Sequence, residues 1–156
     1  MLFNEDNYKF MYAALKEAEY SLEKDEVPIG AVVVYNNRII GKGHNQVENL
    51  TDATAHAEII AITAASNHLK DKVLSECDIY VTIEPCIMCI GAITLSKIRN
   101  LYFAAYEPKT GSCGSVYNIP DENKFNHKVN IFSGIYENES KNLMQNYFKK
   151  KRSSSK

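Results

Sequence analysis

Two short motifs in the middle of the chain carry side chains that can bind a metal ion. The first is His56-Ala57-Glu58, and the second is Pro85-Cys86-Ile87-Met88-Cys89. We expect each motif to begin a helix that follows a strand or a loop. Because Cys86 and Cys89 are three positions apart, their sulfur atoms face the same way within a first helical turn. The positive end of the helix favours thiolate over thiol, which lowers the proton cost of binding a metal.

The combined ligand set predicts a catalytic zinc site. His56, Cys86 and Cys89 supply one nitrogen and two sulfur atoms, a set that suits tetrahedral zinc. Structural zinc sites nearly always have four protein ligands, whereas catalytic sites leave the fourth position to water. Neither Cys77 nor Cys113 has a partner at ligand spacing, although folding can still bring either one to the site. We therefore expect one zinc ion per chain with three protein ligands.

Glu58 is the candidate for proton transfer. It lies two residues beyond His56 and is better placed to point at a water on the metal than to bind the metal itself. Zinc lowers the pKa of such a water to roughly 7, so we expect Glu58 to take its proton as a base and return it as an acid. Attack on an electron-poor ring carbon that bears an amine would then expel ammonia. The motifs thus predict hydrolytic deamination.

Other interpretations of the same residues exist. A Cys-x-x-Cys pair alone is equally consistent with a redox pair or with half of a structural zinc knuckle. A non-catalytic nucleic-acid-binding subunit that keeps zinc only for folding is a hypothesis of another class. Glu58 argues against it, because a structural site has no use for a carboxylate beside the metal. The remaining histidines are expected to be ordinary polar residues: His44, His68 and His127.

Helical and strand-like segments alternate around the motifs, which predicts an α/β fold. Apolar residues recur every three or four positions over residues 5–22, as in an amphipathic helix. Further helices are expected over residues 55–67 with Thr54 as N-cap, over 85–96 with Pro85 in the first turn, and over 139–152. The expected strands are 30–35, 38–41, 78–83, 101–105 and 129–133. Such alternation predicts a mixed sheet covered by helices.

The composition bounds the domain organisation and the partners. A chain of 156 residues with 45% hydrophobic content suits one domain, here residues 1–152, with a disordered tail at 153–156. A secretory signal is not apparent, and no stretch approaches the roughly 20 apolar residues of a membrane span. We therefore expect a cytoplasmic protein. The formal net charge of -1 gives no overall attraction to nucleic acid. A polyanion would therefore have to bind to a local patch of basic residues.

The chain resembles the zinc-dependent nucleobase deaminases, whose signature combines His-x-Glu with Pro-Cys-x-x-Cys. The similarity to the bacterial tRNA-specific adenosine deaminases within this group extends over about residues 5–152. It rests on several further segments and on the basic C-terminal helix. The segments are 27–34, Gly43-His44-Asn45, 54–58, 80–89, Lys109-Thr110-Gly111 and Phe125-Asn126-His127.

The resemblance implies a three-layer α/β/α cytidine-deaminase-like fold with a five-stranded mixed sheet, in a homodimer of single deaminase domains. It implies deamination of adenosine to inosine at the wobble position of a tRNA anticodon. By position, His56, Cys86 and Cys89 would be the zinc ligands, Glu58 the proton shuttle, and Asn45 a residue of the base pocket. An alternative keeps the chemistry but acts on a free base or nucleoside such as guanine or cytosine. The adenosine-family segments and the basic tail argue against that alternative.

The basic tail is the candidate RNA-binding patch, and the anticodon stem-loop of tRNA is the expected partner. The tail consists of Lys149, Lys150, Lys151 and Arg152. It continues a predicted helix whose apolar stripe, Leu143, Met144, Tyr147 and Phe148, we expect to be core. Charges held on a helix can bind phosphates, and an anticodon loop offers unstacked bases that a pocket can accept singly. The alternative is that these charges only complement the helix dipole.

Overall fold

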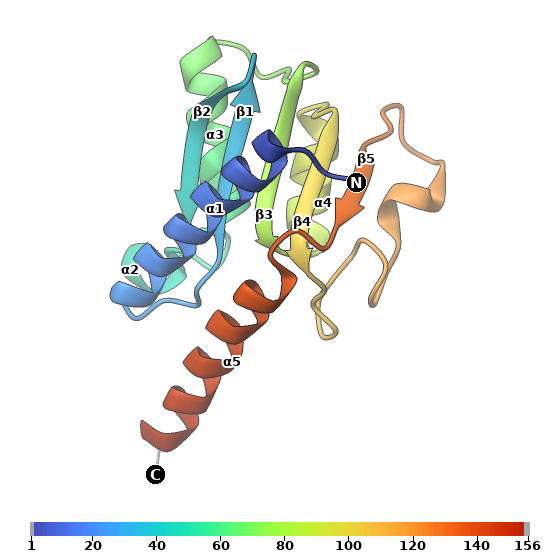
Figure 1. Cartoon of the computed structure of the whole chain (residues 1–156). Coiled ribbons are helices and arrows are strands. Elements are labelled where there is room, and N and C mark those ends of the chain that lie inside the picture. The colour runs from blue at the N-terminus through green and yellow to red at the C-terminus, as the bar shows by residue number, and fades with distance from the viewer. Residues whose placement is uncertain (1, 155–156) are drawn as a thin grey trace.

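A five-stranded sheet in the order β2-β1-β3-β4-β5 forms the centre of the computed structural model, which describes residues 2–154 (Figure 1). The strands are β1 (Gly30–Tyr35), β2 (Arg38–His44), β3 (Cys77–Ile83), β4 (Asn100–Ala105) and β5 (Asn130–Ser133). β1 pairs antiparallel with β2 and β3, whereas β3, β4 and β5 run parallel. β1 and β3 are rich in valine and isoleucine and almost wholly buried, because β-branched side chains pack well inside a sheet.

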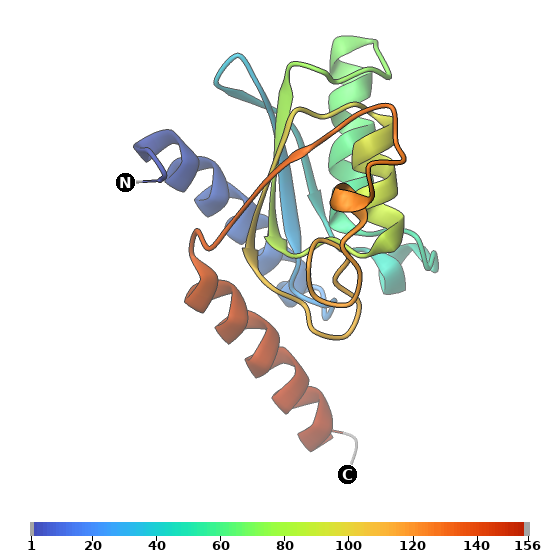
Figure 2. The ribbon, with the colours of Figure 1, turned by 90° about the vertical axis from the view of Figure 1, so that its right-hand side faces the viewer.

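Helices cover both faces of this sheet (Figure 2). One face carries α1 (Glu5–Glu23) and the start of α5 (Glu137–Ser154), and the other carries α3 (Ala57–Leu69) and α4 (Ile87–Leu95). Two short elements were not predicted, the helix α2 (Val47–Leu50) and the 3-10 helix η1 (Ile119–Glu122). The layers confirm the predicted α/β/α fold class. Within residues 2–154, no helix is both long and apolar enough to cross a membrane.

Two apolar cores lie on opposite sides of the sheet. The larger core joins the sheet to α3 and α4, and the smaller one lies under α1. Successive residues of a strand face opposite sides, so Val33 enters the larger core and Val32 the smaller one. The sheet is therefore packed from both sides and holds the start of each helix firmly.

α3 approaches β2 closely because β2 has a glycine where the two meet. A Cβ atom on Gly43 would lie 2.1 Å from the carbonyl oxygen of Ala57, in the first turn of α3. No side chain fits such a gap, so the helix backbone rests directly on the strand. This contact fixes the first turn of α3, and with it the residue before the helix, His56.

The two helices of the metal motifs begin later than predicted. α3 begins at Ala57 with His56 as its N-cap, rather than with Thr54. Thr54 instead donates its amide and its hydroxyl to the Asp52 carboxylate, both at 2.8 Å. In the same way, α4 has Cys86 as its N-cap, so Pro85 precedes the helix instead of lying in its first turn. For α3, the reason is the local turn around Asp52, whose hydrogen bonds to Thr54 compete with the helix and delay its start.

The prediction of a buried stripe on α5 is wrong. Ser140 is the only buried residue of this helix, Phe148 is 42% exposed, and the other three stripe residues are half-buried. The C-terminal half of α5 extends past the ends of the strands, so no part of the sheet covers the stripe there (Figures 1 and 2). Ser153 and Ser154 are helical rather than disordered, and the rest of the expected tail, residues 155–156, lies outside the described residues.

Candidate metal centre and cleft

The three predicted metal ligands meet where α3 and α4 begin. His56 and Cys86 are the N-caps of these helices, and Cys89 is the third residue of α4. The Nδ1 atom of His56 lies 3.6 Å from Sγ of Cys86 and 3.6 Å from Sγ of Cys89. All three ligand atoms lie within 4.8 Å of one another. Two helix N-termini therefore bring one nitrogen and two sulfur atoms to a single point.

The spacing of these atoms fits a zinc ion. With Zn–N near 2.0 Å and Zn–S near 2.3 Å, a nitrogen and a sulfur of a tetrahedral site lie about 3.5 Å apart. The observed Nδ1–Sγ distances of 3.6 Å agree with this value. Within residues 2–154 this is the only such group of metal-binding side chains, and it includes neither Cys77 nor Cys113. The site thus matches the predicted zinc cofactor and offers three protein ligands.

The two cysteines of the centre differ in their acidity. The Cys89 thiol donates a hydrogen bond to the Cys86 sulfur, and His56 adds a second, which together lower the pKa of Cys86 to about 4. The same bond to Cys86, with burial, raises the pKa of Cys89. The bond to Cys86 also raises the pKa of His56. In the chain without a metal, the three groups share protons that a bound cation would displace.

Glu58 lies beside the ligands but outside their group. It is the second residue of α3 and is only 3% exposed. Burial raises the pKa of its carboxyl group, against the effect of a bond from its own backbone amide. Its carboxyl group is within hydrogen-bonding reach of Cys89. A carboxyl group with a raised pKa, held next to the ligand atoms, is suited to accept and return a proton.

A cleft of ≈ 740 Å³ opens over His56, a size that accommodates a small molecule or a single nucleoside. Its walls come from the segment before β1, the segment after β2, the loop after β4 and one face of α5. Asn45 lies in this wall and is 6% exposed. Its backbone donates to the Ile29 carbonyl at 3.1 Å and accepts from the Ser21 hydroxyl at 3.0 Å. The backbone is thus fixed, with the residue in the cleft wall.

Three of the four residues of the α5 stripe belong to this cleft rather than to the core. Met144, Tyr147 and Phe148 line the cleft together with His56 of the metal centre. This placement explains why these side chains are only partly covered. An aromatic surface at the mouth of a pocket suits a ligand that has flat rings.

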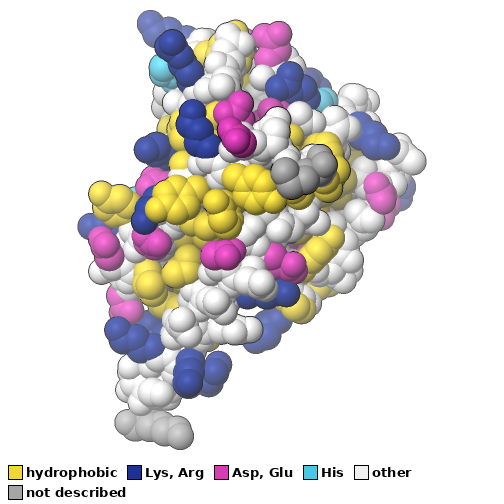
Figure 3. Space-filling model, viewed as in Figure 1, with side chains coloured by type: hydrophobic (Ala, Val, Ile, Leu, Met, Phe, Trp, Pro, Cys, Tyr) yellow, Lys and Arg dark blue, Asp and Glu magenta, His cyan; other side chains and the backbone are white. Residues whose placement is uncertain are grey.

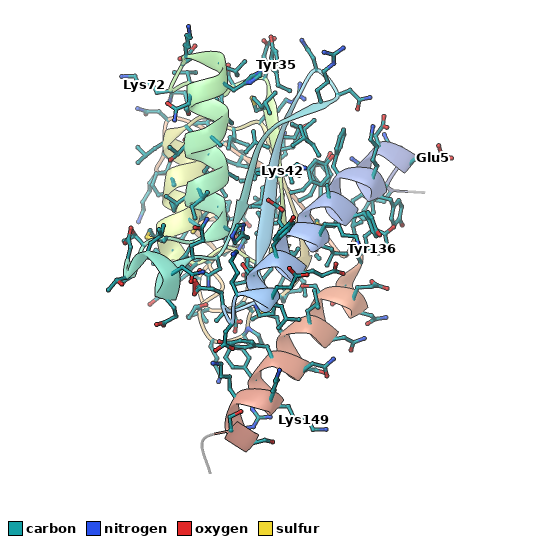
Figure 4. The ribbon with its side chains drawn as sticks, turned by 90° about the vertical axis from the view of Figure 1, so that its left-hand side faces the viewer. Glu5, Tyr35, Lys42, Lys72, Tyr136 and Lys149 are labelled. Carbon is teal, nitrogen blue, oxygen red and sulfur yellow. The ribbon has the colours of Figure 1, made fainter. Side chains whose placement is uncertain are left out.

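The four basic residues of the tail have different surroundings. Lys149 and Lys150 are exposed, and none of the ion pairs within residues 2–154 includes them. Lys149 lies near the C-terminal end of α5 (Figure 4), where Lys and Arg side chains gather on the surface (Figure 3). Lys151 is paired with the Asp25 carboxylate at 2.8 Å. Arg152 lines the cleft. All four side chains are exposed; Lys149 and Lys150 lie in none of these ion pairs, Lys151 is paired, and Arg152 lies at the cleft.

Two buried acids were not among the predicted functional residues. Glu26 accepts from the amides of Glu48 and Asn49 at 2.8 and 3.1 Å and so holds α2 at the cleft. Glu84 accepts hydrogen bonds from the loop after β4. Both residues are 1% exposed. The available signal was an acid directly next to an apolar segment, the one before β1 for Glu26 and β3 itself for Glu84, where a free charge is costly.

Comparisons with known proteins agree with this site. The family model of the cytidine and deoxycytidylate deaminase zinc-binding region matches residues 4–105. A tRNA-specific adenosine deaminase of Aquifex aeolicus (strain VF5) is 47% identical over 143 residues, which is 92% of this chain and 94% of the relative. A solved structure from a study of A-to-I editing by tRNA:A34 deaminases at the wobble position of transfer RNA has a TM-score of 0.84 and 42% identity. That match covers 86% of this chain and 98% of the other. A guanine deaminase from Bacillus subtilis has a TM-score of 0.61 and 35% identity, over 67% of this chain and 66% of the other.

Proposed function

Because the chain belongs to the cytidine and deoxycytidylate deaminase family, we propose that it deaminates adenosine to inosine at the wobble position of a tRNA anticodon. The observation that carries this proposal is the open cleft over a His-Cys-Cys centre with a buried carboxyl group beside it. The relatives named for tRNA adenosine deamination match with higher identity, and over more of the chain, than the Bacillus subtilis guanine deaminase. This difference favours adenosine in tRNA over a free base as the substrate.

The chain supplies the groups for hydrolysis of the amine. His56, Cys86 and Cys89 would hold one zinc ion, which supplies Lewis acidity that makes a water more acidic. Glu58 takes a proton from this water and delivers it to the ring nitrogen next to the amine-bearing carbon. The oxygen of the water bonds to the amine-bearing carbon as this first proton moves. Glu58 then takes the remaining proton of the added hydroxyl group and passes it to the amine. The carbon–nitrogen bond breaks, so that water and adenosine give inosine and ammonia. The burial of Glu58 keeps bulk water away from these transfers.

Asn45 is the proposed base-orienting residue. Its side-chain amide offers both donors and an acceptor, and the bonds to Ile29 and Ser21 keep its backbone in place at the cleft wall. The backbone of Asn45 is therefore already ordered before a substrate binds, unlike that of an exposed loop. An amide held in this way can select and orient the base edge at little entropic cost.

α5 is the proposed contact for the anticodon stem-loop. Tyr147 and Phe148 present partly exposed rings in the cleft wall, on which bases next to the target can stack. Lys149 and Lys150 follow these two residues in α5 and are exposed, so they can bind phosphates of the same strand. Arg152 is positioned at the cleft itself. The helix would therefore bind both the bases and the backbone of a single-stranded loop.

A homodimer of single deaminase domains, formed by residues 1–152, is the proposed assembly. α4 exposes apolar side chains on its outer side, since Ile87 is 58% and Leu95 is 83% exposed. Val116 and Tyr117, in the segment before η1, are 46% and 54% exposed. Exposed apolar residues of this size mark surfaces for other proteins. Because the proposed substrate is tRNA, the cytoplasm is the proposed location of the protein.

The direct test is incubation of the zinc-loaded protein with an anticodon stem-loop that carries adenosine at the wobble position. Inosine, detected by mass spectrometry of the digested RNA, is the expected product. Free guanine, cytosine and adenosine are tested in parallel, and none is expected to be deaminated at a comparable rate. Guanine or cytosine turnover without inosine formation would replace the proposed substrate by a free base. A protein that contains zinc but deaminates neither the stem-loop nor any of the free compounds would support the non-catalytic alternative.

A further inference from the structure

The carboxylate of Glu84 is buried next to the metal centre, yet it takes no part in the reaction described above. Glu84 directly follows β3 and is two residues before the ligand Cys86. The residue is 1% exposed, and it does not line the cleft. None of the ion pairs found within residues 2–154 includes it. A buried acid in these surroundings must be stabilised by hydrogen bonds.

Within residues 2–154, the hydrogen-bond partners of the Glu84 carboxylate all lie in one loop, residues 107–115, between β4 and η1. Its Oε1 atom accepts from the Glu107 amide at 3.0 Å and from the Ser115 hydroxyl. Its Oε2 atom accepts from the amides of Cys113 and Ser115 at 2.8 and 3.1 Å. Each of the two oxygens therefore accepts two hydrogen bonds. A neutral side-chain amide could not replace them, because one of its two polar atoms is a donor.

The loop also packs closely around this carboxylate. A Cβ atom on Gly111 would lie 2.3 Å from the Glu84 Cδ atom, so residue 111 must be glycine for the loop to pass. The amide of Ser112 donates to the Pro85 carbonyl at 2.9 Å, and Ser112 is fully buried. The loop is thus attached to the two residues that immediately precede Cys86.

The first part of the same loop forms a wall of the cleft. Residues 107–110 line the cleft together with His56 and Asn45. We propose that Glu84 is a positioning residue that holds the 107–115 loop in place as a wall of the substrate cleft, at a fixed distance from the metal ligands. This inference rests on the proposed function for the identity of the substrate. Without the carboxylate, the wall would lose its alignment with the centre while the ligands themselves stay in place.

Hydrogen exchange and kinetics of Glu84→Gln test the inference. In the zinc-loaded protein without RNA, the amides of Glu107, Cys113 and Ser115 are expected to exchange at least about 10-fold faster than in the wild type, because local opening becomes easier. Amides of α3 should be unchanged. With an anticodon stem-loop as substrate, KM is expected to rise about 10-fold, the loss typical of a charged hydrogen bond. Zinc content should not change, and kcat should stay within about threefold because the reacting groups are untouched.

Asp78→Asn is the matched control. Asp78 lies near the start of β3, whereas Glu84 follows the end of that strand, and the Asp78 carboxylate is likewise held by hydrogen bonds, from Arg99 and Asn100. This variant should leave both the exchange of the 107–115 loop and KM unchanged. A rise of KM to the same extent in Asp78→Asn would mean that general destabilisation explains the effect of Glu84→Gln.

Gly111→Ala approaches the same contact from the loop and covers the case in which Glu84→Gln does not fold. It should also raise KM and loop exchange, and the double variant should be no worse than the stronger single variant, because both changes break one contact. Unchanged exchange of the loop amides, or a fall in kcat with KM unchanged, would overturn the inference. If the wild type makes no inosine, the proposed function fails, and the exchange data alone then decide whether Glu84 anchors the loop.

Discussion

Lys149 and Lys150, which lie in none of the ion pairs found within residues 2–154, should contribute more to RNA binding than Lys151, which is paired with Asp25. Each phosphate that a lysine neutralises on a single strand adds about 0.7 to the slope of log affinity against log salt. Lys149 and Lys150 are available for this, whereas Lys151 is 2.8 Å from the Asp25 carboxylate. We therefore expect Lys150→Ala to lower the slope by about 0.7, and Lys151→Ala to lower it by less than about half of that.

The assay is the dissociation constant of an anticodon stem-loop, measured by fluorescence anisotropy at several salt concentrations. Between 50 and 200 mM salt, a fourfold change, a loss of 0.7 in slope makes the decline in affinity about 2.6-fold smaller than in the wild type. Asp25→Asn is the complementary variant. It releases Lys151, and asparagine tolerates the positive φ of 60° at this position. This variant should steepen the slope.

Equal effects of Lys150→Ala and Lys151→Ala would refute the reasoning, because the ion pair with Asp25 would then have no influence. Identical slopes for all variants would remove the tail from RNA binding. In that case the basic residues would act only at the C-terminal end of the α5 dipole.

The site supports four further expectations. Glu58→Gln should retain zinc and fold but lower kcat by about 10²–10⁴-fold, the usual contribution of an acid–base group, and retained turnover in a single-turnover assay would remove Glu58 from the mechanism. Removal of zinc with a chelator should make Cys86 the cysteine that iodoacetamide modifies fastest at pH 7, since its pKa is lowered to about 4 while burial raises the pKa of Cys77 and of Cys113. Peptide mass spectrometry measures this order, and faster labelling of Cys113 would contradict it. Asn45→Ala should lower kcat/KM for the stem-loop by about 10- to 100-fold through a lost hydrogen bond to the base, and an unchanged value would exclude it from the pocket. Gly43→Ala should lower the free energy of unfolding by about 1–3 kcal/mol, because its Cβ atom would overlap α3, and an unchanged denaturant midpoint would contradict the close packing.

The metal motifs could be identified from the sequence because their geometry is local. The spacing of Cys86 and Cys89 corresponds to one helical turn, so the two sulfur atoms lie together in any helix that starts there. His56 and Glu58 likewise share a first turn. The strands were recognisable for a similar reason, since β1 and β3 are short runs rich in β-branched residues. These features depend on residues fewer than ten positions apart.

The start of each motif helix and the burial of α5 were decided by the tertiary structure. Threonine is a residue type that often caps the start of a helix. The hydrogen bonds of Thr54 to Asp52, and the packing of α3 on Gly43, nevertheless move the helix start to His56. The stripe on α5 has the spacing of a core face. Its burial depends on what lies opposite, and α5 extends beyond the sheet to line the cleft instead.

The sequence by itself determined the chemistry of this protein: the ligand types, their pairing within helical turns, the adjacent acid and the α/β alternation. Only the tertiary structure brought His56 to the two cysteines, 30 and 33 residues away. It alone gave Glu84 its partners, backbone amides 23 to 31 residues further along the chain. Backbone amides are the same for every residue type except proline, so a pattern of side chains contains no record of which amides a buried carboxylate will meet.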